Sequence, residues 1–115
     1  MAYDEELADR VRVVLADEPG LTERTMFGGL AFMVNGNMAC GIVREELMLR
    51  LGAERADAAL AEPHVRQMDF TGRPMTGMVY IEREGLDDAA VRRWVEQAAG
   101  FARSLPPKAK ASSTP

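Results

Sequence analysis

The chain has one cysteine, Cys40, and one histidine, His64, and these residue types can act together as a nucleophile and its general base. Such a pair needs the thiol and the imidazole within hydrogen-bond reach, with the thiol in an electropositive setting. Cys40 lies instead in an apolar run, residues 38–42, that predicts a buried strand. His64 follows Pro63 and has no metal-ligand spacing around it. We therefore expect an inert, packed thiol, a surface histidine and no catalytic residues.

Methionine is the second residue type with potential chemistry, because thioethers bind soft Cu(I) and also repack around varied protein partners. Beyond the start residue the methionines are Met26, Met33, Met38, Met48, Met68, Met75 and Met78. They alternate along the expected strands, so their side chains should point to both faces of a sheet, whereas a copper site needs several to converge with Cys or His. Core packing is the favoured interpretation, a partner-binding apolar surface comes second, and a metal site is not expected.

Two glycine-containing segments, Gly28-Gly29 and Gly72-Arg73-Pro74, could approach an anion closely. Neither matches a phosphate-binding or dinucleotide-binding pattern. Nearby arginines suit bidentate anion recognition, although scattered solvated charges explain them equally well. The ligand or partner surface that these features suggest consists of Phe27, Gly28, Gly29, Arg50, Arg73, Pro74, Met75 and Tyr80.

The elements that must position these residues follow from apolar spacing, turn residues and helix caps. Helices are expected over residues 3–16, 54–61 and 87–105, and strands over residues 25–35, 37–43, 47–51, 66–70 and 77–82. Asn35-Gly36 predicts a tight hairpin turn, while Gly28-Gly29 predicts a bend within one continuous strand. Met38, Cys40 and Ile42 are expected on one face of the following strand. The order α-β(3)-α-β(2)-α predicts a two-layer α+β fold, an antiparallel sheet with helices packed on one face.

Composition narrows the class of protein. A chain of 115 residues fits a single domain, here residues 1–105, and residues 106–115 are expected to form a disordered tail. The formal net charge of −4 disfavours a nucleic-acid binder. The first ten residues are acidic and lack an export signal, and no apolar run approaches the ~20 residues of a membrane span, so we expect a cytoplasmic protein.

Several short motifs in a fixed order resemble those of the TfoX N-terminal domain family. They are Met26-Phe27-Gly28-Gly29, Phe32-Met33, Gly36, Met38, Leu49-Arg50, Phe70, Arg73-Pro74-Met75, Tyr80 and a closing helix with Trp94. The resemblance covers residues 3–105 and implies an α+β fold similar to that of type III secretion chaperones. The chain resembles a stand-alone member, without the C-terminal domain of the competence regulators that give the family its name. No catalytic residues are carried over.

The leading functional hypothesis is a non-catalytic, cytoplasmic protein-interaction and regulatory module. We expect it to be homodimeric and to bind through an apolar edge or face of the sheet. A second hypothesis is a small-ligand or anion-binding protein that uses the Gly28-Gly29 bend with Arg50, Arg73 and Tyr80. A third is a transcriptional regulator of the competence type. No cofactor, metal or membrane partner is expected, and neither is direct nucleic-acid binding.

Overall fold

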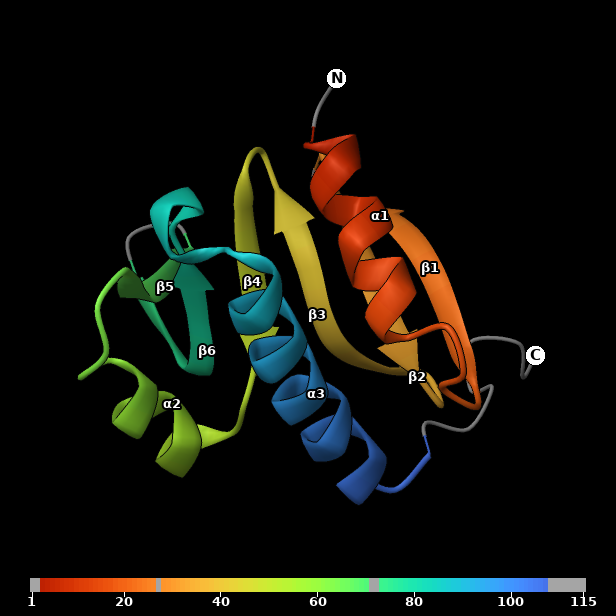
Figure 1. The fold of residues 1–115 in the computed structure, drawn as a ribbon. Coiled ribbons are helices and arrows are strands. Elements are labelled where there is room, and N and C mark those ends of the chain that lie inside the picture. Colours follow the sequence, from red (N-terminus) through yellow and green to blue (C-terminus); the bar gives the residue numbers. More distant parts are fainter. Residues whose placement is uncertain (1–2, 27, 71–72, 108–115) are drawn as a thin grey trace.

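The computed structural model describes residues 3–26, 28–70 and 73–107. The described residues form three α-helices, a short 3-10 helix and one six-stranded antiparallel sheet (Figure 1). In chain order the elements are α1 (Glu5–Val14), β1 (Leu21–Met26), β2 (Gly29–Val34), β3 (Asn37–Val43), β4 (Glu46–Arg50), α2 (Ala53–Ala59), β5 (Val65–Phe70), β6 (Arg73–Ile81), η1 (Arg83–Gly85) and α3 (Asp88–Ser104). The chain is therefore an α+β fold. Of the tail expected at residues 106–115, residues 108–115 lie outside the described residues.

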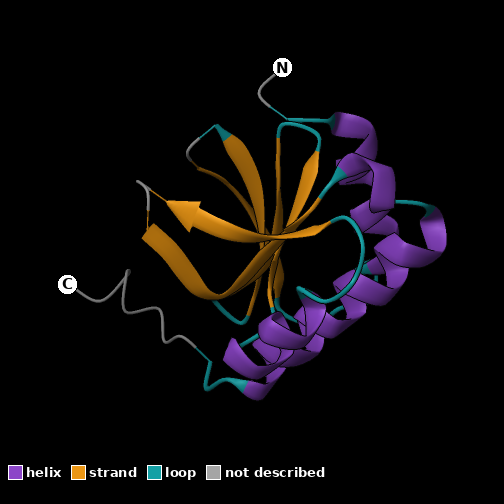
Figure 2. Cartoon of the chain, turned by 90° about the vertical axis from the view of Figure 1, so that its left-hand side faces the viewer, coloured by secondary structure: helices purple, strands orange, loops and turns teal. Residues whose placement is uncertain are grey.

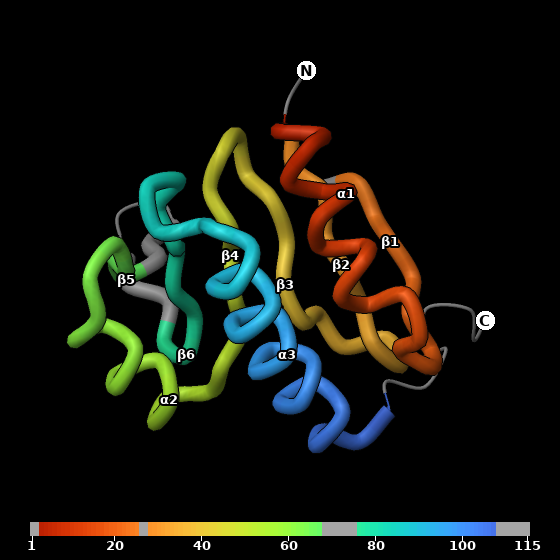
Figure 3. The backbone as a smooth tube through the Cα atoms, in the orientation of Figure 1, coloured from red at the N-terminus to blue at the C-terminus, as the bar shows by residue number. Residues whose placement is uncertain are grey.

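The sheet has the strand order β1-β2-β3-β4-β6-β5, and every neighbouring pair is antiparallel. The first four strands form a meander, and the last two form a hairpin beside α2 (Figure 3). The expected turn between β2 and β3 is confirmed, because Asn35 and Gly36 have φ angles of 53° and 81°. No described helix has the length and apolarity needed to cross a lipid bilayer.

The prediction of one bent strand over residues 25–35 is wrong, because the chain reverses there and forms two strands. Gly28 has a φ of 75°, a left-handed conformation that glycine adopts without steric cost. β1 then pairs with β2 from Leu21↔Val34 to Met26↔Gly29. β1 is the outermost strand, so its largely polar sequence LTERTM is compatible with the sheet although it lacks the expected apolar alternation. The first group of strands has four members, not three.

A bulge in β3 corrects a second prediction, that Met38, Cys40 and Ile42 share one face. Cys40 pairs with Phe32, whereas Met38 pairs with Met33, so β3 contains one extra residue, Ala39, at this point. An inserted residue changes which face the preceding side chain occupies. Cys40 and Ile42 consequently belong to the main core, and Met38 belongs to a separate cluster.

The helices lie on one side of the sheet (Figure 2). α3 packs against β2, β3 and β4, α2 packs against β6, and α1 packs against α3. As expected, Asp87 caps α3, since its carboxylate accepts a hydrogen bond from Ala90 N at 2.8 Å. The helices together cover the large side chains on this face of the sheet, which include Phe32, Ile42, Leu47, Leu49, Val79 and Ile81, all essentially inaccessible to solvent. Full burial of one such side chain contributes about 1.5–3 kcal/mol, so this face of the sheet supplies most of the stabilising apolar contact.

Candidate functional site

The only thiol and the only imidazole of the chain are far apart. Cys40 lies in the core with 0% of its surface exposed, and burial raises the pKa of its thiol to about 12 because the thiolate would be desolvated. His64 is exposed and precedes β5. Two strands, β4 and β6, lie between β3 and β5, which gives a lateral separation of roughly 14 Å at ~4.8 Å per strand. The buried thiol and the surface histidine are both confirmed, and this arrangement cannot form a nucleophile–base pair.

Four methionines gather on the side of the sheet opposite the helices. Met33 pairs with Met38 and Met48 pairs with Tyr80, while Met78 alternates with core residues of β6. Met48 and Met78 are each 8% exposed, and the half-buried Met38 and Tyr80 pack against them. We call this surface, made of Met33, Met38, Met48, Met78 and Tyr80, the methionine face. The expectation that the methionines point to both faces is wrong for these four, whereas the expected core packing is confirmed for Met48 and Met78, which are buried in a small second cluster.

Glycine makes room for the centre of the methionine face. Gly41 of β3 pairs directly with Met48, and a Cβ atom at Gly41 would lie 2.9 Å from the Met48 Cε. The same Cβ atom would lie 2.7 Å from the backbone carbonyl oxygen of Leu30, so the pairing of β2 with β3 leaves no room for a side chain at residue 41, and the end of the Met48 side chain lies beside this position.

Arginines surround the methionine face. The Arg66 guanidinium stacks on Tyr80, with its central carbon 4.5 Å from the ring centroid, and forms ion pairs with Glu46 and Glu82. Arg24 lies on the same face from β1, opposite Ala31, and is exposed. Arg66 and its two carboxylates carry a formal charge of −1, whereas Arg24 is positive, so the two margins of the methionine face differ in charge.

The structure distributes the sequence-predicted surface over several places. Gly28 lies in the β1–β2 connection, and Gly29 begins β2, where a Cβ atom would meet the Ile42 carbonyl oxygen at 2.6 Å. Arg50 ends β4 beside Met78, and its guanidinium carbon lies 5.7 Å from the centroid of the Phe101 ring. Phe27 and the side chains of Arg73, Pro74 and Met75 lie outside the described residues.

Tyr80 belongs to the methionine face, whereas the Arg50 guanidinium reaches Phe101 of α3, and the register keeps Gly29 apart from Arg50. Gly29 lies beside the end of β3 near Ile42, whereas Arg50 lies two strands away at the opposite end of β4. Along the strand this offset is about four residues, or roughly 13 Å. The glycine bend and Arg50 therefore do not line one cleft.

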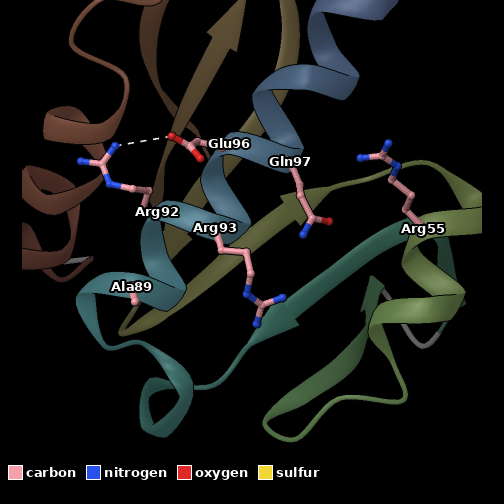
Figure 4. A pocket seen from close by; sticks show the side chains of 6 residues that line it. All are labelled: Arg55, Ala89, Arg92, Arg93, Glu96 and Gln97. Carbon is pink, nitrogen blue, oxygen red and sulfur yellow. Dashed lines mark hydrogen bonds and ion pairs between the residues drawn. The ribbon is translucent and has the colours of Figure 1, made fainter.

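A second surface, between α2 and α3, was not predicted from the sequence. A groove of about 510 Å³ is lined by Arg55, Ala89, Arg92, Arg93, Glu96 and Gln97 (Figure 4). Two adjoining cavities of about 170 and 350 Å³ also include Arg55 and Gln97 in their walls, so the three form one groove along α3. Its residues come from segments about 35 positions apart and follow no motif, so only the packing of the helices reveals it.

The groove carries its own ion pairs. Arg93 stacks on Trp94, with its guanidinium carbon 4.3 Å from the ring centroid, and bonds to Glu62 at 3.1 Å. Arg92 pairs with Glu96 at 3.4 Å, one turn further along α3. All four charged side chains of these pairs are more than 40% exposed, so each pair adds little to stability.

The fold and its surfaces define a class: a small α+β domain whose sheet has helices on one face and a methionine-rich opposite face. The sequence profile of the TfoX N-terminal domain matches residues 14–102, which is most of the chain. The chain belongs to the TfoX N-terminal domain family. Searches of curated proteins and of solved structures gave no match.

Proposed function

We propose that this TfoX N-terminal domain is a non-catalytic regulatory module of the cytoplasm that forms a homodimer through its methionine face. One observation carries the proposal: four methionines and Tyr80 lie together on the side of the sheet that the described helices leave uncovered. Unbranched thioether side chains adapt their shape to a partner, which makes methionine common at protein-binding surfaces. The similarity to secretion chaperones that the sequence implies fits a protein that binds other chains.

The face is a better interface than the exposed edge of the sheet. β1 forms one edge, and its central residues Glu23 and Arg24 are charged and exposed. Charged side chains on an edge strand oppose pairing with a further strand. The edge at β1 therefore has the features of a protected edge, whereas the accessible apolar surface of the methionine face comes from the half-buried Met33, Met38 and Tyr80.

Charged side chains at the β1 and β5 margins of the methionine face favour pairing with a second copy of the same chain. Arg24 lies at the β1 margin, whereas Glu46 and Glu82 lie towards the β5 margin, around Arg66. A two-fold axis parallel to the strands would place the β1 margin of one protomer over the β5 margin of its partner. The register places Arg24 level with Arg66, so Arg24 would then face the group of Arg66, Glu46 and Glu82, whose formal charge is −1, across an apolar centre.

The net charge of the chain weighs against direct nucleic-acid binding. With a formal charge of −4, the chain lacks the basic excess that phosphate contacts require.

Sedimentation velocity across a hundredfold range of protein concentration, up to millimolar, tests the proposal. We expect wild type to reach the mass of a dimer and Met38→Lys to stay monomeric, since a charge on the half-buried Met38 would be desolvated in the interface. Val13→Lys is the matched control, because Val13 is 68% exposed on α1, away from the methionine face. It should dimerise like wild type, and circular dichroism should show all three proteins folded. A wild type that stays monomeric throughout, or a Met38→Lys variant that dimerises equally well, contradicts the proposal.

A further inference from the structure

The groove between α2 and α3 exists because each helix packs on a different part of the sheet. α2 packs against β6, whereas α3 packs mainly against β3 and β4 (Figure 1). The space between them is lined on one side by Arg55 and on the other by a row of α3 residues from Ala89 to Ser104. These sixteen residues of α3 span about 22 Å, so the α3 side of the groove has the length of an extended segment of several residues rather than of a small ligand.

The charged groups of the groove favour an acidic occupant. Arg55, Arg92 and Arg93 line its main cavity, and Figure 4 shows their guanidinium groups spread along it rather than converging on one point. The carboxylates of Glu62 and Glu96 pair with Arg93 and Arg92 in exposed positions. Pairs of this kind contribute about 0–1 kcal/mol, so an incoming carboxylate can replace them at small cost.

Gln97 gives the groove a group that matches a peptide backbone. It is half-buried between Arg93 and Arg55 and lines all three cavities. A primary amide offers one acceptor and two donors, the same kinds of group that a peptide unit presents. The surrounding floor is made of small or aromatic residues, Ala58, Ala59 and Trp94, which leave room for a backbone to approach.

We propose that the α2–α3 groove binds an extended acidic peptide segment of a partner protein. Arg55 and Arg92 form charge-assisted hydrogen bonds to its carboxylates, and Gln97 pairs with one of its peptide groups. The groove lies on the helical side of the molecule, opposite the methionine face (Figure 2). This inference goes beyond the proposed homodimer and does not depend on it.

Fluorescence anisotropy with the full chain tests this inference. The probe is a fluorescein-labelled decapeptide that alternates Glu and Ala, which places all carboxylates of an extended strand on one side. Wild type should bind it at low ionic strength, with an affinity that falls as salt is added. The corresponding Gln/Ala peptide should bind at least about tenfold more weakly, as expected for the loss of one or more charge-assisted contacts.

Charge-reversal variants locate the site. Arg55→Glu combined with Arg92→Glu should weaken binding of the Glu/Ala peptide at least about tenfold, while Arg24→Glu, an exposed change on β1, should leave it within about twofold. Met38→Lys should bind the peptide like wild type, which separates this inference from the dimer.

Several results would overturn the assignment of the groove. They are no binding by wild type at low salt, equal binding of the Gln/Ala peptide, or an equal loss of affinity in Arg24→Glu. Binding of a labelled oligothymidylate that the double variant abolishes would reassign the groove to nucleic acid and refute the peptide.

Discussion

The reactivity of Cys40 provides the sharpest test of the non-catalytic interpretation. The thiolate is the reactive form of cysteine, and burial raises the pKa of the Cys40 thiol from 9.0 to about 12. At pH 8 a thiol with the ordinary pKa is about 9% ionised, whereas one with a pKa of about 12 is only about 0.01% ionised. The three-unit difference therefore lowers the reactive population about 1000-fold, before the loss of solvent access is considered.

Ellman's reagent measures this effect directly, because Cys40 is the only thiol in the chain. In native buffer at pH 8 we expect the labelling rate of Cys40 to be at least about 1000-fold below that of free cysteine, since reaction requires opening of the core. In concentrated urea the same protein should react at the rate of the free amino acid, which serves as the control. Native labelling within about tenfold of that rate would refute the reasoning and restore Cys40 as a candidate nucleophile.

The raised pKa of Cys40 also predicts how the stability of the protein changes at alkaline pH. The folded state keeps the Cys40 proton at pH values where the unfolded state loses it, so this contribution to stability is complete below pH 9.0 and declines above it. The slope is about 1.4 kcal/mol per pH unit between pH 9 and 12. Urea unfolding of wild type and Cys40→Ala from pH 8 to 10 should show this additional decline in wild type alone, and parallel curves would contradict it.

Three further substitutions test contacts that hold the fold together, each by urea unfolding. Glu23→Gln should cost at most about 1 kcal/mol at neutral pH. Hydrogen bonds from Arg12 lower the pKa of Glu23, so its contribution is present above the unfolded pKa and should be lost as the pH falls through the lowered folded pKa. A difference that stays undiminished once Glu23 is protonated in both states would contradict the assignment. Gly52→Ala should cost about 1–3 kcal/mol, because residue 52 has a φ of 86° and its new Cβ would lie 2.7 Å from Phe101 Cε1; a neutral result would show that the backbone can relax. Asn37→Ala should cost about 1–3 kcal/mol, since its buried amide donates a 2.9 Å hydrogen bond to the carbonyl of Pro106, and a stability equal to wild type would exclude that bond as a structural tie.

The sequence predicts elements well wherever local chemistry determines them. The Asp87 cap and the apolar stripe of α3 lie within one helix, and the Asn35-Gly36 turn needs only two neighbouring residues. The edge strand β1 was missed because a strand at the margin needs no apolar alternation, so its polar residues resemble a loop. A single inserted residue at Ala39 could not be seen either, because a bulge is a property of the pairing between β2 and β3.

The functional surfaces were harder to predict because they depend on the fold as a whole. The methionine face follows from the alternation of four strands and from the bulge that moves Met38. The α2–α3 groove depends on which strands α2 and α3 pack against. Neither arrangement is encoded in the spacing of neighbouring residues, so sequence patterns alone give residue types without their grouping.

The position of α3 has a consequence for how the protein is made in the cell. α3 follows all six strands in the chain, yet it covers the apolar side of β3 and β4. During synthesis the meander therefore leaves the ribosome with Phe32, Ile42 and Leu49 still open to water, and they stay so until the last helix has emerged. Until α3 has been synthesised, this exposed apolar face is prone to aggregation, and translation that stalls before α3 leaves the sheet without its cover.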